Sequence, residues 1–332
     1  MITPLDIENK KFSKQMMNGY SVEEVDDFLD ELTACYEKLY KESNENQDKI
    51  AELNGKLEHY KQIEGTLNNT LIMAQSTAED IKNVAGTKTW YKKGDLVTKA
   101  ITNDDGIQSD GIIRLARAAK KYGKVWVVAP DGQRSAMSHR ITLHETIEFF
   151  PVDFPVEGVH AYASTGTPAD CVRFGILNIV KEKPDYVFSG INYGYNSGTD
   201  IQYSATVGSA LEAACAGVHA VAFSEGASEC HEVTDAYLER MMEELMEQPL
   251  AYNQIWNVNF PQCELEKLRG ILYDRKIADC GFFIDEYLEE ELENGRIRLT
   301  VHGNYNENAP EGTDFRALVD GYISVGKVDN LR

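Results

Sequence analysis

The stretch Thr102-Asn103-Asp104-Asp105-Gly106 decides the fold class, because it places two adjacent carboxylates at a turn between a strand and a helix. The preceding residues 96–101 are few and partly apolar, as in a strand, whereas residues 107–122 carry apolar side chains at helical spacing. A ligand at such a turn lies at the carboxyl edge of a parallel sheet, against a helix N-terminus. The same five residues also fit a plain turn that caps a helix, so the motif needs support from the rest of the chain.

Length and charge limit the classes of function. The chain has 332 residues, room for about two domains at ~150 residues each. It carries 54 acidic and 33 basic residues, a formal net charge of −21. Such a surface repels nucleic acid backbones, so we expect no nucleic acid partner. A small phosphate substrate remains compatible, because a bound divalent cation inverts the local field.

Cysteine usage and hydropathy indicate the compartment. The 6 cysteines are scattered without a CxxC pair, which favours reduced thiols over a disulfide framework or a zinc site. The sequence has no apolar run close to the ~20 residues of a transmembrane helix, and its N-terminus is too polar for a secretory signal. We therefore expect a cytoplasmic protein.

Further motifs follow the acidic turn in a fixed order within residues 99–328. They are Asp131-Gly132-Gln133-Arg134-Ser135-Ala136-Met137-Ser138-His139, Gly166-Thr167-Pro168-Ala169-Asp170-Cys171, Ser189-Gly190-Ile191-Asn192-Tyr193-Gly194-Tyr195-Asn196-Ser197-Gly198, Tyr203-Ser204-Ala205-Thr206-Val207-Gly208, Gly312-Thr313-Asp314-Phe315 and Gly321-Tyr322-Ile323-Ser324. Together these residues resemble the SurE family of metal-dependent 5'-nucleotidases. The resemblance implies a three-layer α/β domain with a doubly wound, largely parallel sheet. It also implies that Leu299 to Val328 form strands exchanged between the subunits of a dimer.

The predicted catalytic residues are Asp104 and Asp105, whose hard oxygen ligands suit Mg²⁺ or Mn²⁺. By the resemblance, Ser135 and Asn192 complete the metal site with neutral oxygens. A cation held in this way polarises a phosphoryl group and promotes attack by water. Direct attack by Asp104, which forms an aspartyl-phosphate, is the alternative.

The predicted phosphate-binding residues are Asn196, Ser204 and Thr206, which surround a glycine-rich stretch. Glycines there let backbone amides approach an anion, and a helix that starts near Thr206 offers its N-terminus to phosphate. The alternative is a plain turn before a small-residue helix at 207–216. The segment 166–170 is expected to shape the same cleft, with Asp170 as a helix cap.

The boundary between the two halves carries a departure from the SurE pattern. Residues 86–98 are interpreted as a linker, and residues 99–332 as the phosphatase domain. Lys99 occupies a position of the first strand that should be buried, which predicts an imperfect central strand.

The N-terminal half is of a different kind. Residues 21–85 are highly charged, without proline, and their apolar side chains recur in steps of three and four, a heptad pattern. This pattern predicts a parallel coiled coil. Because a lone helix cannot bury such a stripe, it also predicts self-association as a dimer or tetramer. The apolar positions after Ile50 are Leu53, Leu57, Tyr60, Leu67, Leu71, Ala74, Ala78, Ile81 and Ala85.

Residues 1–85 resemble the DivIVA family of coiled coils that sit at curved membrane at bacterial septa and poles. The resemblance rests on residues 1–29, including Asn9-Lys10-Lys11-Phe12-Ser13-Lys14 and Gly19-Tyr20-Ser21-Val22-Glu23-Glu24-Val25, and on segments between 59 and 79. The N-terminal loop at 14–18 lacks the aromatic and arginine that touch lipid in that family. Three lysines still predict a weak contact of residues 10–17 with anionic lipid, at ~1 kcal/mol each. A solvated loop that binds no membrane is the alternative.

The sequence therefore predicts a divalent-metal-dependent phosphomonoesterase that hydrolyses nucleoside 5'-monophosphates and is carried on a self-associating DivIVA-like arm. Its location is predicted as the cytoplasm, at the septum or pole membrane surface. The alternative function is a non-enzymatic scaffold with a degenerate phosphatase domain. A dinucleotide-dependent oxidoreductase is excluded, because no G-x-G-x-x-G motif follows a first strand.

Overall fold

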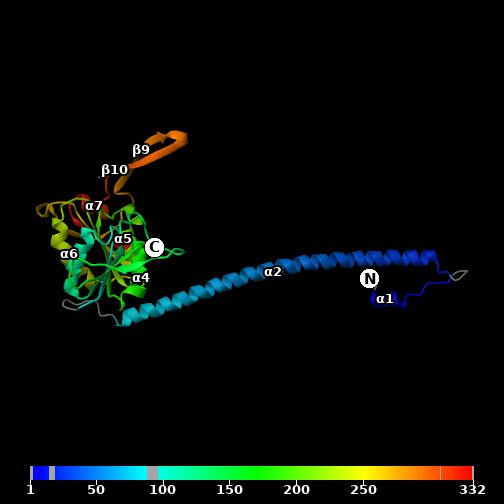
Figure 1. The fold of residues 1–332 in the computed structure, drawn as a ribbon. Coiled ribbons are helices and arrows are strands. Elements are labelled where there is room, and N and C mark those ends of the chain that lie inside the picture. Colours follow the sequence, from blue (N-terminus) through cyan, green and yellow to red (C-terminus); the bar gives the residue numbers. More distant parts are fainter. Residues whose placement is uncertain (1–2, 15–18, 88–95, 307, 331–332) are drawn as a thin grey trace. The chain divides into compact units, whose positions relative to one another are not determined.

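The computed structural model describes residues 3–14, 19–87, 96–306 and 308–330, with side chains throughout these ranges except at positions 5, 51, 58–87, 285 and 305. The chain divides into two compact units, Met1–Thr87 and Lys88–Arg332 (Figure 1). Within the described ranges, no helix is both long enough and apolar enough to cross a membrane.

The second unit is built on a nine-stranded sheet in the order β3-β4-β2-β1-β5-β6-β7-β11-β8. Neighbouring strands run parallel except at the β3–β4 and β7–β11 pairs, so the predicted, largely parallel α/β sheet is confirmed. The strands are β1 (Lys99–Thr102), β2 (Val125–Pro130), β3 (Phe149–Pro151), β4 (His160–Ser164), β5 (Tyr186–Tyr193), β6 (His219–Glu225), β7 (Gln254–Phe260), β8 (Ile271–Arg275) and β11 (Ile323–Asp329).

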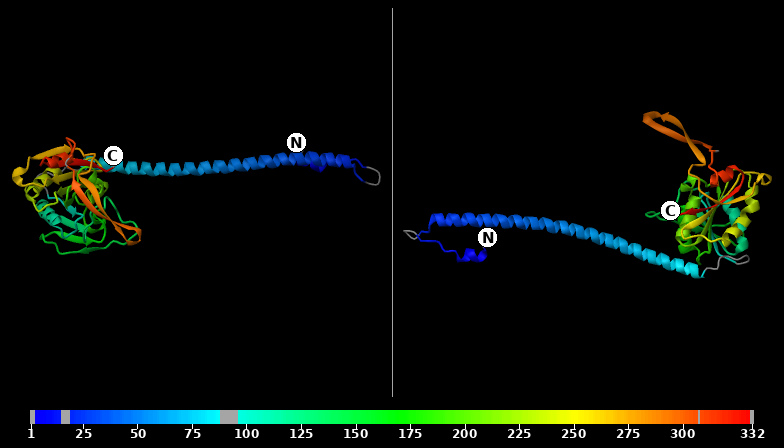
Figure 2. Two further views of the ribbon diagram at one scale, coloured as in Figure 1. Left: turned by 90° about the horizontal axis from the view of Figure 1, so that it is seen from above. Right: turned by 180° about the vertical axis from the view of Figure 1, so that it is seen from behind.

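Helices cover both faces of this sheet, which gives the predicted three layers (Figures 1 and 2). One face is covered by α3 (Asp110–Ala119) and α6 (Glu232–Glu247), and the other by α4 (Pro168–Phe174) and α5 (Ala205–Cys215). A short helix, α7 (Asp314–Val319), precedes β11.

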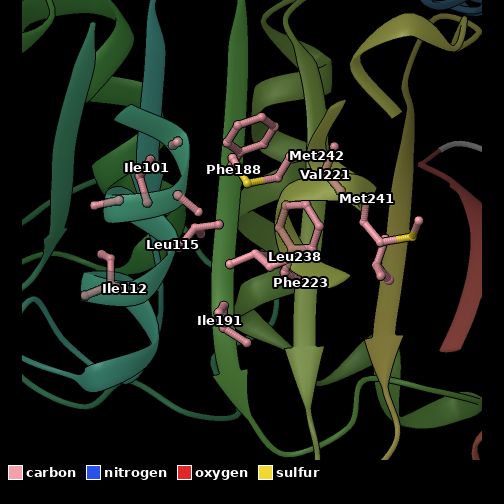
Figure 3. Close-up of a cluster of buried hydrophobic side chains, with 14 of the residues drawn as sticks. Ile101, Ile112, Leu115, Phe188, Ile191, Val221, Phe223, Leu238, Met241 and Met242 are labelled. Atoms are coloured by element: carbon pink, nitrogen blue, oxygen red, sulfur yellow. The ribbon is translucent and has the colours of Figure 1, made fainter. Parts of the chain in front are cut away.

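The core follows from the alternation of side chains along the strands. Phe188 and Phe223 point toward α3 and α6, where they pack with Met241 and Met242 (Figure 3). The strand residues between them, such as Val187, point to the other face of the sheet and pack against α4 and α5 in a second cluster. Each fully buried side chain of this size stabilises the fold by roughly 1.5–3 kcal/mol.

The central strand β1 is intact, contrary to the imperfect strand that Lys99 predicted. All of its residues pair with β5, and Lys99, Ala100 and Ile101 also pair with β2. The Lys99 side chain is fully buried, and its ammonium donates a hydrogen bond of 2.9 Å to the carbonyl oxygen of Val97. The lysine is accommodated because its charge meets this carbonyl and the nearby Asp185 carboxylate.

The segment Leu299 to Val328, predicted to be exchanged between subunits, overlaps two different parts of the structure. A separate two-stranded antiparallel hairpin is formed by β9 (Phe283–Leu292) and β10 (Arg296–Tyr305), and it stands out from the sheet domain (Figures 1 and 2). The last strand, β11, lies instead inside the main sheet of its own chain, between β7 and β8. The reason is that β11 pairs with β7 over six residues, from Ser324 to Asp329.

The first unit consists of α1 (Pro4–Asn9) and a single helix, α2 (Val22–Thr87), of 66 residues. At ~1.5 Å per residue, α2 is about 100 Å long. Along its described part the leucines of the heptad stripe are open to solvent: Leu39 is 47%, Leu53 62% and Leu57 52% exposed. The predicted long helix is therefore confirmed, and Leu39, Leu53 and Leu57 of its stripe stay open to solvent in the described part of the single chain. The heptad positions from Tyr60 to Ala85 lie outside the described side chains.

The N-terminal segment packs on the beginning of α2. The ring of Phe12 makes edge contacts with those of Tyr20 and Phe28, and the Lys10 ammonium lies 4.8 Å from the centre of the Phe28 ring. The Ser13 hydroxyl and amide both donate to the Glu24 carboxylate, at 2.8 and 2.9 Å. Loop residues 15–18, which include part of the predicted lipid contact at 10–17, lie outside the described residues.

Replacing Lys99 with methionine should stabilise the second unit. Burial lowers the pKa of Lys99 from 10.5 to about 8, partly offset by Asp185, so the folded state holds a costly ammonium below pH 8. As the pH rises from about 8 to 10.5, the cost disappears. Lys99→Met should therefore raise the Tm at pH 7, and the gain should shrink toward pH 10.5. A pH-independent gain, or a gain equal to that of the exposed Lys124→Met, would contradict this account.

Candidate functional site

The acidic turn follows β1 directly and is pressed against a second loop. Gly106 adopts a φ of +96°, and a Cβ there would lie 3.1 Å from the backbone of Gly132. The amide of Arg134 donates to the carbonyl oxygen of Asp104 at 2.6 Å. These contacts hold the loop after β2, residues 131–140, against the end of β1. The two segments meet because neighbouring parallel strands have their carboxyl ends at the same edge of the sheet.

The Asp104 carboxylate is buried at the centre of the site. Its Oδ1 accepts a hydrogen bond of 2.5 Å from the hydroxyl of Thr206, the second residue of α5. The same hydroxyl lies 3.4 Å from the Oδ1 of Asn192, whose amide is fixed by donating to the Gly194 carbonyl at 2.7 Å. Residues far apart in sequence therefore converge from β1, β5 and α5.

The Asp105 carboxylate is fixed from two sides. Its Oδ2 accepts a hydrogen bond of 3.0 Å from the backbone amide of Tyr193, the last residue of β5. The side chain of Gln133, from the loop after β2, also donates to this carboxylate. Asp105 thus joins the ends of three adjacent strands, β2, β1 and β5.

Ser135 lies on the loop that carries these contacts. It follows Arg134, which is bonded to the Asp104 backbone, and its side chain is exposed. The far end of the loop is anchored by the Ser138 amide, which donates to the Tyr203 carbonyl at 2.9 Å. Gly208 permits the close approach of α5, because a Cβ there would lie 2.4 Å from the Ser138 carbonyl oxygen. The loop that carries Ser135 is therefore fixed at the Asp104 backbone on one side of this residue and at Tyr203 on the other.

Ser204 and Asn196 have partners of their own. Ser204 caps α5, its hydroxyl accepting from the Val207 amide at 3.0 Å. The Asn196 side-chain amide donates to the Ser224 hydroxyl at 2.7 Å, and the backbone carbonyl oxygen of Asn196 accepts from the side chains of Asn257 and Asn259 at 2.9 and 3.0 Å. Both residues thereby shape the loop between β5 and α5, and their contact with phosphate stays a prediction.

Burial dominates the electrostatics of the two carboxylates. It raises the pKa of Asp104 to about 7, although the Thr206 hydroxyl opposes the shift, and the charge of Asp105 raises this pKa further. Burial likewise raises the pKa of Asp105 against the Tyr193 amide and Gln133, while Glu225 adds to the rise. Negative charge in the site is thus poorly compensated by the protein itself.

The donor set suits a hard divalent cation. Acceptor oxygens exceed donors here, because the one hydroxyl proton of Thr206 serves only one of Asp104 Oδ1 and Asn192 Oδ1. Among the described residues, no cluster of three or more His, Cys, Asp and Glu side chains is arranged for a metal, so a cation would be held by two carboxylates and neutral oxygens. Oxygen-only ligation is what Mg²⁺ and Mn²⁺ prefer.

The remaining motifs support the loops around the site. Thr167 and Asp170 form a capping box at α4, and the Asp170 carboxylate also holds the Thr142 amide and hydroxyl, which confirms Asp170 as a helix cap. Asp314, from the Gly312–Phe315 motif, accepts hydrogen bonds from Gly198 at 3.0 Å and Ala278 at 2.9 Å. It therefore ties the loop after β5 to the segment that leads to the β9–β10 hairpin.

Comparison with known proteins identifies the family. The model of the family described as Survival protein SurE matches residues 100–279, and that described as DivIVA protein matches residues 2–125. A protein named 5'-nucleotidase SurE from Clostridium botulinum (strain Loch Maree / Type A3) is 38% identical over 231 residues, which are 68% of this chain and 90% of the relative. The chain belongs to the SurE family.

Two further relatives agree with this assignment. The protein named 5'-nucleotidase SurE from Thermoanaerobacter sp. (strain X514) is 38% identical over 230 residues, 68% of this chain and 89% of the relative. The crystal structure of the SurE protein from Aquifex aeolicus superposes with a TM-score of 0.61 at 32% identity, over 71% of this chain and 94% of that one. Both resemblances predicted from sequence, SurE and DivIVA, are confirmed.

Several residues of the site escaped the sequence analysis. Gln133 and the backbone amide of Tyr193 orient Asp105, and the sequence predicted no role for either. Asn257 and Asn259 lie on the buried strand β7 and hold the Asn196 loop. The sequence signal for this contact is the pair of asparagines at alternate positions of a mostly apolar strand. Buried side-chain amides require hydrogen-bond partners, so such a pair indicates a polar contact with a neighbouring loop.

The raised pKa of Asp104 predicts how stability depends on pH without a divalent cation. The unfolded carboxyl titrates near 3.8 and the folded one near 7, so the folded state binds more protons between these values. Stability should therefore fall as the pH rises from about 4 to 7, and stay lowered above it. In chelator, Asp104→Asn should flatten this decline in Tm, whereas the exposed Asp153→Asn should not. Equal slopes for wild type and Asp104→Asn would contradict the assignment.

Proposed function

We propose that this protein is a divalent-metal-dependent phosphomonoesterase that hydrolyses nucleoside 5'-monophosphates. The observation that carries the proposal is the convergence of Asp104, Asn192 and Thr206, with contacts of 2.5 and 3.4 Å at one hydroxyl. Relatives that carry the name 5'-nucleotidase SurE at 38% identity support the class of substrate. The cation is expected to be Mg²⁺ or Mn²⁺, held by Asp104, Asp105, Ser135 and Asn192.

A bound cation would supply positive charge that polarises the phosphoryl group. The protein's own residues would position the substrate. The N-terminus of α5, with Ser204 and Thr206, favours the phosphate through its amides and dipole. Asn196 acts in the same loop. Asp105 is kept in one orientation by the Tyr193 amide and Gln133, so little reorganisation accompanies the reaction. Either water or Asp104 serves as nucleophile.

The second candidate function is a scaffold with a degenerate phosphatase domain. It was favoured by the expected damage to the first strand, but β1 is fully paired with its neighbours. The buried Asp104 carboxylate also weighs against it, because an unused ionisable group at this depth costs stability that substitution would recover.

The arm is proposed to self-associate as a parallel coiled coil, giving a dimer or tetramer. Its long helix exposes a stripe of leucines, and burying each of these fully would contribute roughly 1.5–3 kcal/mol. A septal or polar location, with weak contact of residues 10–17 to the membrane surface, also stays a proposal. Phe12 is engaged with Phe28, whereas Lys10, Lys11 and Lys14 are all exposed in the described part of this segment.

The activity is tested by phosphate release from AMP with and without Mg²⁺ or Mn²⁺. Asp105→Asn should lower metal-stimulated release by on the order of 100-fold, because it removes an anionic ligand of the cation that polarises the phosphoryl group. Its circular dichroism and Tm should show a folded protein, and Asp153→Asn, an exposed control, should keep full activity. Activity that persists in chelator, or an Asp105→Asn enzyme as active as wild type, would refute the proposal.

Self-association is tested by sedimentation of the full chain. Leu53→Asp with Leu57→Asp should dissociate the oligomer or reduce its order, since two charges would have to be buried in the seam. Asn44→Asp with Asn54→Asp adds the same charge at exposed positions outside the stripe and should leave the mass unchanged. Identical sedimentation of both double variants would mean that the stripe is not the interface.

A further inference from the structure

Tyr193 occupies a fixed position at the rim of the site. It is the last residue of β5, pairs with Glu225 across to β6, and donates its amide to Asp105 at 3.0 Å. Its Cα is therefore held by a strand and by a reactive carboxylate at once.

The ring of Tyr193 is half open. The residue is 52% exposed, although its own amide is bonded inside the site. A tyrosine ring loses little conformational freedom on binding, and a partly covered ring presents one face to a flat partner.

The charge around the rim restricts the kind of partner. Asp104, Asp105 and Glu225 lie on this edge, and the chain as a whole carries a net charge of −21. A second anionic group beyond the phosphate would be repelled. A neutral, planar, aromatic group would gain contact without adding charge, and every nucleobase has such a face.

We propose that the ring of Tyr193 stacks on the nucleobase of the substrate and makes the enzyme prefer nucleotides to phosphate esters that lack a base. The inference rests on the proposed function and adds the determinant of its substrate class. Stacking tolerates any base, so Tyr193 would favour purine and pyrimidine nucleotides alike, with the larger purine surface giving the stronger contact.

The test compares AMP with ribose 5-phosphate, which keeps the sugar and phosphate but lacks the base. Both are assayed with the full chain in Mg²⁺ or Mn²⁺, and the measured quantity is the ratio of their kcat/KM values. Base stacking of ordinary strength predicts that Tyr193→Ala lowers this ratio about 5- to 150-fold, mainly through KM for AMP. Tyr193→Phe keeps the ring and should keep the ratio.

Tyr252→Ala is the matched control. Tyr252 is 49% exposed but precedes β7, at the opposite edge of the sheet, so its loss should leave both kcat/KM values unchanged. A ratio for Tyr193→Ala within twofold of wild type would overturn the inference and leave the phosphatase intact. A wild-type protein that releases phosphate from neither compound would overturn the proposed function, and this inference with it.

Discussion

Burial of the Asp104 carboxylate at the carboxyl end of β1 is the constraint on which the rest of the site depends. An ionised group at that depth is tolerated only with hydrogen bonds or a counter-charge nearby. Thr206 supplies one bond at 2.5 Å, and the raised pKa, about 7, indicates that this bond does not compensate for burial. The geometry of α5, β5 and the loop after β2 is organised around this deficit, which a hard cation would relieve.

The loops that carry the site are fixed by buried polar contacts rather than by apolar packing. Asn196 is held through Ser224, Asn257 and Asn259, and Asp314 holds Gly198. Removing one partner from such a set leaves a buried polar group unpaired, at about 1–3 kcal/mol each. A loop secured in this manner keeps its shape in the absence of substrate, which is what positioning a phosphate requires.

The two units obey different physical rules. The SurE domain buries both faces of its sheet under its own helices, whereas α2 leaves Leu39, Leu53 and Leu57 exposed. The sheet of the domain is thus covered within one chain, whereas the β9–β10 hairpin also exposes apolar side chains, among them Leu288 at 59% and Val301 at 65%. The self-association proposed for the arm would cover its exposed leucines.

The sequence by itself determined the fold class, both families, the long helix and the carboxylate pair, because these depend on local periodicity and on motifs of adjacent residues. Tertiary structure alone decided the rest. Lys99 conflicts with a buried strand by sequence, yet the Val97 carbonyl oxygen accepts a hydrogen bond of 2.9 Å from its ammonium, and β1 stays paired. The final strand β11 joins the main sheet beside β7, a pairing between segments far apart in the sequence that only the tertiary structure decides. The contacts of Gln133 and Tyr193 with Asp105 join the ends of three strands. Spacing along the chain does not predict which residues meet where separate strands end at one edge of the sheet.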